Sequence, residues 1–129
     1  MVVGFFGALL AVWLVVLSVR VIALRGNPAF GWFAFANFGG DSLQRAIRGQ
    51  ANLTEYAPIF LILMMIAEIS DMRPESLYWY GGVFLAGRIM HGICFGFLRK
   101  NMALRVGGTV LTLFPLIGLA IAILSGYLQ

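Results

Sequence analysis

The sequence predicts an all-α fold, an integral membrane four-helix transmembrane bundle, and two observations carry that prediction. Hydrophobic residues make up 61% of the 129 residues and charged residues only 11%, against roughly 25% charged residues in a soluble globular domain. Four segments are apolar over the roughly 20 residues that a helix needs to cross the hydrocarbon core of a bilayer. The length is that of one domain, so we expect residues 1–129 to form a single transmembrane unit.

The expected helices follow from the four apolar segments and from the turn residues between them. They cover Val2 to Leu24, Arg45 to Ile69, Leu77 to Leu98 and Val106 to Leu128. The second and third connections are short, which makes the last three helices antiparallel neighbours. Before the second helix, Gly39 and Gly40 break the chain. Asp41, followed three residues later by Gln44, predicts a capping box at the start of that helix.

The basic residues lie at the ends of the apolar segments, where they indicate membrane topology rather than nucleic-acid binding, although the net charge is +4. Those near the first and third connections are Arg20, Arg25, Arg45, Arg48, Arg99, Lys100 and Arg105. The second connection carries Arg73. The positive-inside rule places the first and third connections in the cytoplasm and both termini on the non-cytoplasmic side. Arg20 is expected to extend its side chain toward the interface.

A polar stripe interrupts the start of the second helix. Arg48, Asn52 and Glu55 have the spacing i, i+4 and i+7, which places them on one helical face, with Arg45 beside them. One interpretation is an interhelical clamp, whose hydrogen bonds contribute about 0.6–2 kcal/mol each in membranes. The other is a ligand site. A charge at the centre of a membrane helix costs about 2.5–3.5 kcal/mol, so a clamp alone hardly offsets the cost and we favour the ligand site.

The third helix carries a second polar stripe. Its members, spaced i, i+3, i+7 and i+11, are Arg88, His91, Phe95 and Arg99. Arg88 lies near the middle of the expected helix and needs an anion nearby. Glu55 of the same or a neighbouring subunit is the first candidate, and Glu68, otherwise an interfacial charge, is the second. His91 is the only histidine and is either a packing residue that forms a hydrogen bond or a participant in chemistry.

Further features concern the third and fourth helices. Gly92 and Gly96 have the GxxxG spacing that permits close contact between helices. Cys94, the only cysteine, fits a small buried hydrophobe. Arg105 stands at the expected start of the fourth helix, where the partial positive charge of a helix N-terminus favours an anion. The alternative is an arginine that anchors the helix at the interface.

The polar residues at the cytoplasmic mouth of the bundle fit a small ligand with carboxylates and an ammonium group. They are Arg45, Arg48, Asn52, Glu55, Arg99 and Arg105. Arginine binds carboxylates through two parallel hydrogen bonds, and the apolar helices offer entry from the lipid to a hydrophobic co-substrate. If the ligand carries a thiol, the arginine charge favours its thiolate. No cluster of His and Cys has metal-ligand spacing, so we expect no metal.

One motif of the second helix is specific enough to compare with known families. It reads Arg48-x-x-x-Asn52-x-x-Glu55-x-x-Pro58. In a chain of this size with four expected spans, it resembles the MAPEG family (membrane-associated proteins in eicosanoid and glutathione metabolism). Arg88 and His91, with the basic start of the fourth helix, add to the resemblance. What it implies is a homotrimer of four-helix subunits that binds glutathione between neighbouring subunits near the cytoplasmic face.

The resemblance also implies a role for each polar residue. Glutathione would be bound by Arg48, Asn52, Glu55, Tyr56 and His91, with Arg45, Arg88 and Arg99 in the same substrate-binding set. Tyr56 is similar to the tyrosine of the leukotriene C4 synthase branch, and His91 to the histidine of the microsomal prostaglandin E synthase branch. Arg105 corresponds to the arginine that stabilises the thiolate, with Arg99 as its rival. Phe95 departs from the family, which often has a tyrosine there, so one hydroxyl contact is missing.

The leading prediction is therefore a membrane glutathione transferase. Glutathione, activated as its thiolate, would attack a lipophilic electrophile or reduce a peroxide. One alternative is a non-catalytic membrane scaffold or adaptor. Another is a small multidrug transporter, a class with four helices and a similar length. Such a transporter needs an acidic residue within its first helix, and the segment Val2 to Leu24 has none.

Overall fold

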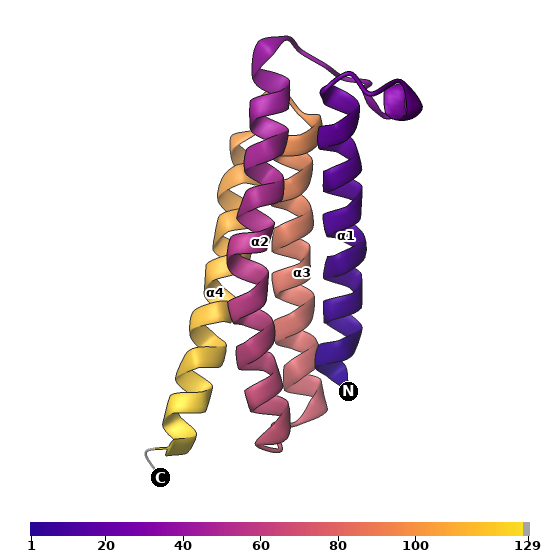
Figure 1. The fold of residues 1–129 in the computed structure, drawn as a ribbon. Helices are drawn as coiled ribbons and strands as arrows, with labels where there is room; N and C mark the ends of the chain where they lie inside the picture. Colours follow the sequence, from indigo (N-terminus) through magenta and orange to yellow (C-terminus); the bar gives the residue numbers. More distant parts are fainter. Residues whose placement is uncertain (128–129) are drawn as a thin grey trace.

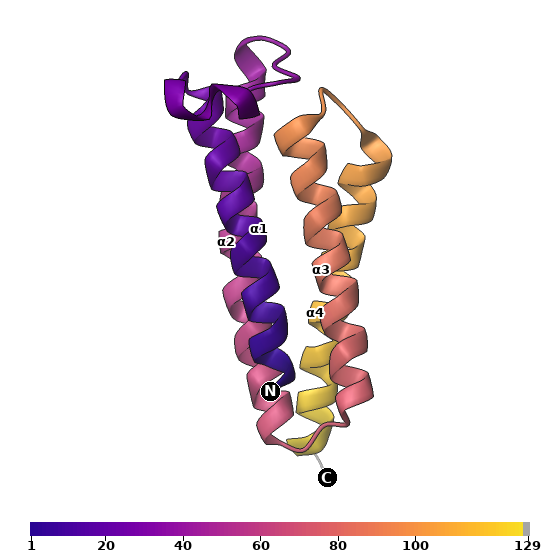
Figure 2. The same cartoon turned by 90° about the vertical axis from the view of Figure 1, so that its right-hand side faces the viewer.

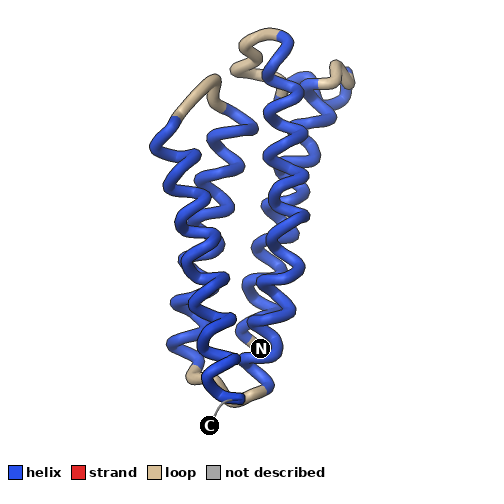
Figure 3. Tube along the Cα trace, turned by 90° about the vertical axis from the view of Figure 1, so that its left-hand side faces the viewer, coloured by secondary structure: helices blue, strands red, loops and turns tan. Residues whose placement is uncertain are grey.

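The computed structural model describes residues 1–127 and consists of four α-helices and one short 3₁₀-helix (Figure 1). The α-helices are α1 (Val2–Leu24), α2 (Gly40–Ile69), α3 (Pro74–Phe97) and α4 (Met102–Tyr127), and the 3₁₀-helix η1 (Pro28–Phe33) lies in the first connection. The described residues contain no strand (Figure 3), so the predicted all-α fold is confirmed. The predicted end of the fourth helix, Leu128, lies outside the described residues.

The α-helices lie side by side along one axis (Figure 2). α1 contacts α2 and α3, and α4 contacts α3 and α2, so the prediction that the last three helices are neighbours is confirmed. The α1–α2 and α3–α4 connections meet at one end of the bundle, and the α2–α3 turn lies at the other (Figures 1 and 2). We call the end that carries the α1–α2 and α3–α4 connections the basic end, because the arginines of these two connections lie there.

Three of the α-helices are long and apolar enough to cross a membrane, namely α1, α2 and the part of α4 over residues 102–126. Large apolar side chains are exposed along their outer faces, for example Val12, Phe114 and Leu124. An apolar surface of this extent is unfavourable in water and fits contact with lipid. α3 is the exception among the described α-helices, because several glycines and the polar residues Arg88 and His91 interrupt its apolar sequence.

The later helices begin earlier than predicted, at Gly40, Pro74 and Met102 instead of Arg45, Leu77 and Val106. The predicted capping box before α2 is wrong. Gly39 is the N-cap residue and makes no side-chain hydrogen bond to the helix, and its φ of +106° suits glycine. Asp41 lies inside the first turn, where its charge still complements the helix dipole.

Local chemistry explains the starts of α3 and α4. Pro74 occupies the first turn of α3, where its fixed φ is helical and its missing N–H is not needed. The side-chain oxygen of Asn101 accepts a hydrogen bond from the Leu104 N–H at 3.0 Å and so caps α4. Arg105 consequently lies in the first turn of α4 rather than before it.

Close contact between α3 and its neighbours depends on glycine. A Cβ at Gly87 would lie 2.8 Å from a backbone carbon of α4. A Cβ at Gly108 would lie 2.9 Å from the backbone nitrogen of His91 in α3. Toward α1, a Cβ at Gly92 would lie 2.7 Å from the Trp13 indole. The predicted close packing at the GxxxG spacing is therefore confirmed, and α1 is the partner.

Arg20 of α1 extends to the first connection, at the end where the sequence places an interface, but it is buried there, with 1% of its surface exposed. Its Nε donates to the Gly96 carbonyl at 2.7 Å. Its Nη1 donates to the carbonyls of Phe33 and Phe35, each at 2.6 Å, and Nη2 donates to that of Ala36 at 3.3 Å. One side chain therefore joins α1, the end of α3 and the first connection.

Aromatic rings also surround the Arg20 guanidinium. Its central carbon lies 4.9 Å from the centroid of the Phe97 ring and 5.1 Å from that of Phe35. These two rings stack on each other with centroids 5.9 Å apart. Carbonyl oxygens thus satisfy the N–H groups of the cation, and ring faces attract its charge. The arginine is packed at the basic end as part of the fold.

Glu68 caps α1 at the opposite end of the bundle. Its carboxylate accepts hydrogen bonds from the N–H groups of Val2 at 2.6 Å and Val3 at 2.9 Å. The first N–H groups of a helix have no partner within the helix, and a negative charge there complements the helix dipole. The residue predicted as the second candidate to pair with Arg88 is therefore engaged elsewhere.

Gly87→Ala should lower the thermal stability of the detergent-purified protein, because the new Cβ would overlap the backbone of α4. Overpacking of this kind costs about 1–3 kcal/mol. The matched control is Gly82→Ala in the same helix, where a Cβ meets nothing within 4 Å and alanine improves helix propensity. Thermal unfolding followed by circular dichroism measures both variants. Equal midpoints for the two would contradict the close contact.

Arg20→Met should loosen the first connection, because several backbone carbonyls lose their donor at once. Each buried carbonyl left without a partner costs about 1–3 kcal/mol. Hydrogen exchange followed by mass spectrometry should show faster exchange over residues 28–36. Arg25→Met, which changes an exposed arginine of the same connection, is the control. Slow exchange retained in Arg20→Met would mean that other contacts hold the connection.

Candidate functional site

Two polar spaces lie on the α2 side of the structure. The first is an open hollow of about 450 Å³ at the start of α2, which we call the mouth and which is lined by Asp41, Gln44, Arg45, Ile47 and Arg48. The second is a cavity of about 40 Å³ between α2, α3 and α4, which we call the Arg88 chamber. It is lined by Asn52, Tyr56, Arg88, His91, Thr109, Thr112 and Leu113. The predicted stripes of the second and third helices thus meet at the chamber.

Arg88 is a deeply buried charge of the chamber. It is 2% exposed, and its Nε has no hydrogen-bond partner among residues 1–127. The central carbon of its guanidinium lies 5.5 Å from the centroid of the Tyr56 ring. The residues that line the chamber in the described part of the chain include no carboxylate. Within one chain the predicted pairing is therefore wrong, because Glu55 is exposed and Glu68 caps α1.

The burial of Arg88 leaves an energetic deficit. A charge moved from water into a protein interior costs several kcal/mol unless it is paired. Its cation–π contact with Tyr56 recovers only about 0.5–2 kcal/mol. Guanidinium does not lose its proton in proteins, so the chamber cannot become neutral in that way. An anion at the chamber would therefore be stabilised.

His91 forms another wall of the chamber. It is 6% exposed, and its Nδ1 has no hydrogen-bond partner among the described residues. The imidazole stacks on the Phe95 ring with centroids 4.5 Å apart and an angle of 19° between the planes. His91 therefore packs through its ring face, lines the polar cavity and keeps one buried ring nitrogen without a partner in the described chain.

The Phe95 ring makes cation–π contacts with two arginines from different helices. The central guanidinium carbon of Arg45 in α2 lies 4.7 Å from the ring centroid, and that of Arg105 in α4 lies 5.8 Å from it. Gly49 allows this approach, since a Cβ there would lie 3.0 Å from the Cβ of Phe95. Phe95, the residue at which the family often has a tyrosine, thus makes cation–π contacts with two arginines, and we call its ring the aromatic platform.

Arg45 is also anchored to the backbone of α3. Its Nη2 donates to the Cys94 carbonyl at 3.0 Å, and the thiol of Cys94 donates to the Asn101 carbonyl at 3.3 Å. The Nε of Arg45 is buried without a hydrogen-bond partner in the described chain. Cys94 is buried, as predicted. Arg45 is therefore fixed in position, and its buried Nε–H donor is unused within the described chain.

Other predicted site residues lie at the surface. Arg48 is exposed at the mouth, Arg99 is exposed just after α3, and Arg105 is exposed in the first turn of α4. Glu55 is exposed on α2 and does not line the chamber. The structure therefore places Asn52, Tyr56, Arg88 and His91 around one cavity and Arg45 with Arg105 over one ring. In a single chain Glu55 and Arg99 join neither group.

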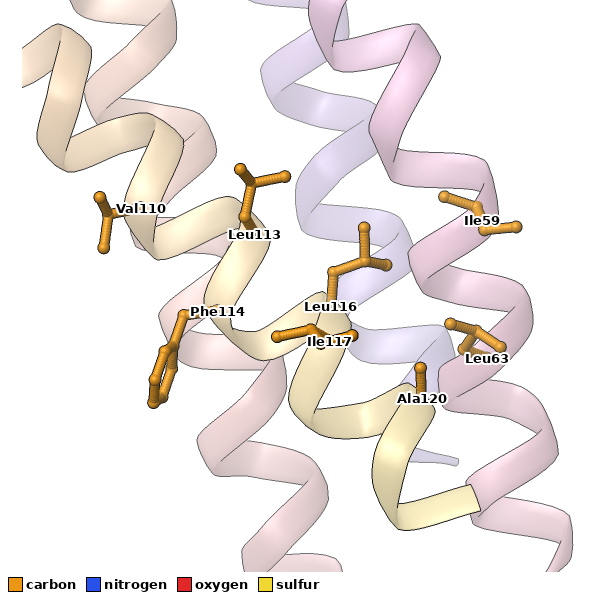
Figure 4. A pocket seen from close by; sticks show the side chains of 8 residues that line it. All are labelled: Ile59, Leu63, Val110, Leu113, Phe114, Leu116, Ile117 and Ala120. Carbon is orange, nitrogen blue, oxygen red and sulfur yellow. The ribbon is translucent and has the colours of Figure 1, made fainter. Parts of the chain in front are cut away.

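An apolar groove of about 590 Å³ lies between α2 and α4 (Figure 4). It is lined by Ile59, Leu63, Val110, Leu113, Phe114, Leu116, Ile117 and Ala120. Leu113 also lines the Arg88 chamber. On α2, Tyr56, Ile59 and Leu63 follow one another at i, i+3 and i+7, on one helical face. The polar chamber and the apolar groove are therefore neighbours along the same pair of helices.

Three contributors were missed by the sequence analysis. Gly49 brings α2 close to Phe95, and Thr109 and Thr112 line the chamber. The two hydroxyls donate to carbonyls of their own helix, those of Arg105 and Gly108, at 2.9 and 2.7 Å. A signal for the threonines existed, because Arg105, Thr109 and Thr112 form a polar stripe at i, i+4 and i+7 in an apolar helix.

Fold and site together define a class, the helical membrane proteins with an arginine-rich polar site at one end of an apolar bundle. The sequence matches the MAPEG family over residues 3–125, and the chain belongs to that family. It is 32% identical over 122 residues to the inner membrane protein YecN of Escherichia coli K12, covering 95% of this chain and 89% of that protein. YecN of Escherichia coli O6:H1 (strain CFT073) gives the same values. The predicted family is confirmed, and these relatives support an integral membrane protein.

A double-mutant cycle should detect the contact between Phe95 and Arg45. We expect Phe95→Leu and Arg45→Met to be coupled by about 0.5–1 kcal/mol in unfolding free energy, because each removes the same cation–π contact. Denaturant unfolding of the two single variants and the double variant provides the measurement. Phe95→Leu combined with Arg73→Met is the control, since Arg73 precedes α3 at the opposite end of that helix. Purely additive effects in both cycles would refute the platform.

Proposed function

We propose that this protein is a membrane-embedded glutathione transferase. The observation that supports the proposal most strongly is the pair Arg45 and Arg105 over one aromatic ring, beside a cavity that contains a third arginine, Arg88. A tripeptide with two carboxylates and a thiol would supply the negative charge that this cluster lacks. Membership of the MAPEG family, which includes glutathione transferases, adds to the support.

The proposed binding mode assigns the carboxylates to the mouth. Arg45 and Arg48 line this open hollow and give it positive charge. Asn52 and Tyr56 lie further along α2 toward the chamber and would contact the middle of the peptide. Glu55, as the acidic member of the stripe, would bind the ammonium group.

The proposed reaction is attack of the glutathione thiolate on a lipophilic electrophile. A free thiol with a pKa of about 8.5 is mostly protonated at neutral pH, so the site must favour the ionised form. The thiol proton leaves to solvent, and the thiolate forms the new carbon–sulfur bond as the leaving group departs. Arg105 stabilises the thiolate electrostatically, and the apolar groove offers a path for the electrophile from the lipid.

The proposed assembly is a homotrimer in which all four α-helices span the membrane and the basic end faces the cytoplasm. The positive-inside rule supports this orientation, because the basic connections share one end. Both termini would then lie on the non-cytoplasmic side. Glutathione bound between subunits would also account for Glu55 and Arg99, since exposed side chains of one chain can reach a ligand held by the next. The proposed reaction requires no metal.

Isothermal calorimetry with glutathione tests the binding. We expect a saturable heat with the purified wild-type protein and a loss of affinity in Arg48→Gln, because a charged contact to a carboxylate is removed. Arg73→Gln, at the opposite end of the bundle, is the control and should bind normally. No heat and no thermal stabilisation by glutathione would instead favour a non-catalytic scaffold.

Arg105→Gln should separate catalysis from binding. We expect turnover of an electrophilic aryl halide with glutathione to fall by about a hundredfold, because one electrostatic stabiliser of the reacting thiolate is lost. The glutathione Kd should change by less than about tenfold. Steady-state kinetics and calorimetry on the same preparation give the two quantities. Unchanged turnover in this variant would remove Arg105 from the mechanism, and a matching loss in Arg99→Gln would point to its rival.

A further inference from the structure

The Arg88 chamber is too small to hold a peptide. Its volume of about 40 Å³ leaves room for roughly two or three water-sized groups. It lies between α2, α3 and α4, and the described residues that line it include cationic and neutral polar side chains but no acid. The chamber therefore selects for one small group of atoms, and its charge is positive.

The hydrogen-bonding groups of the chamber are unbalanced. Arg88 and His91 are each more than nine-tenths buried, and each has one ring or guanidinium nitrogen without a partner among residues 1–127. The Thr109 and Thr112 hydroxyls donate their hydrogen bonds to carbonyls of α4. The face of the Tyr56 ring is already occupied by the Arg88 cation. What the chamber lacks is an acceptor with negative charge.

We propose that the Arg88 chamber is a binding site for one small monovalent anion, held by the Nε–H of Arg88 and by His91 as its Nδ1–H tautomer. A neutral histidine carries one N–H donor, and the tautomer is set by the partner. A cation is excluded by the permanent charge of the guanidinium. A water molecule would satisfy the donors but would leave the buried charge uncompensated.

Two sources supply an anion of this size and charge, a free halide and the ionised sulfur of a bound thiol. The second source rests on the proposed glutathione transferase function. It is sterically reasonable, because Asn52 lines the chamber and belongs to the same α2 stripe as Arg48 at the mouth. Arg105, which lies over the Phe95 ring on which His91 stacks, would then act at longer range, and Arg88 would touch the sulfur directly.

Halide binding is tested without glutathione. Thermal unfolding of the purified full-length protein is measured in sodium bromide and in sodium gluconate at equal ionic strength. We expect bromide to raise the midpoint relative to gluconate in the wild type and in Arg25→Gln, an exposed control. The bromide-specific rise should be lost in Arg88→Gln. The same rise in Arg88→Gln as in the wild type would overturn the proposal.

Crystals of the wild-type protein grown in sodium bromide give a second test, which does not depend on whether Arg88→Gln folds. The expected result is an anomalous scattering peak beside Arg88 Nε and His91 Nδ1. A chamber filled by water alone, or by a carboxylate side chain of a neighbouring subunit, would overturn the proposal.

The thiol arm distinguishes the two sources. If the sulfur occupies the chamber, bromide should compete with glutathione but not with S-methylglutathione, which has no ionisable thiol. The ultraviolet absorbance of the bound thiolate should also be lost in Arg88→Gln while the peptide still binds. Bromide that binds without competing assigns the chamber to a free halide. If glutathione does not bind at all but bromide does, the proposed function fails and the anion site stands.

Discussion

Two guanidinium groups buried inside a bundle that faces lipid impose the main constraint on this structure. A buried charge must find hydrogen-bond partners or a counter-charge. Arg20 finds backbone carbonyls of α3 and of the first connection, together with aromatic ring faces. Arg88 has the face of Tyr56 and a nitrogen that lacks a partner in the described chain. The first arginine therefore serves the fold, whereas the second leaves a positive cavity that can serve a ligand.

The site depends equally on where helices approach closely. Gly49 brings α2 to Phe95, and Gly87 with Gly108 brings α4 to α3. These contacts set the positions from which Arg45 and Arg105 reach the same ring. A helix pair separated by ordinary side chains would lie farther apart, and the two cations would then not share one aromatic platform. Backbone packing thus determines the electrostatics of the site.

Much of the fold was predictable because hydrophobic segments of sufficient length and short turns leave few arrangements for a membrane bundle. The stripes at Arg48 and Arg88 were also visible from helical spacing. The direction in which a long side chain extends could not be predicted from spacing. Arg20 is predicted to extend toward the interface, and the structure shows it buried at that end of the bundle, because its acceptors lie on segments distant in sequence, around Phe33 and Gly96. Spacing places a residue on a face but does not identify the atoms that meet it.

The same limit explains the outcome for the acidic residues. Glu68 is the second predicted partner of Arg88, but its carboxylate accepts hydrogen bonds from the N–H groups of Val2 and Val3 at the start of α1. Glu55 has the spacing of the α2 stripe and still lies outside the chamber. The exposed arginine Arg99 is a similar case. Glu55 and Arg99 are both exposed on a single chain, so their role in the proposed site would come from contact with a neighbouring subunit.

The tight seam between α3 and α4 bears on how the chain would enter a bilayer. α3 carries Arg88 and His91 and, alone among the described α-helices, falls short of the apolar character of a spanning segment. An arginine near the middle of a helix makes that helix costlier to place in lipid by itself. α4 is strongly apolar and meets α3 backbone to backbone at Gly87 and Gly108. Residues of α4 also line the cavity that holds Arg88 and His91, so pairing with α4 shields the polar groups of α3 from lipid and would ease the entry of α3 into a bilayer.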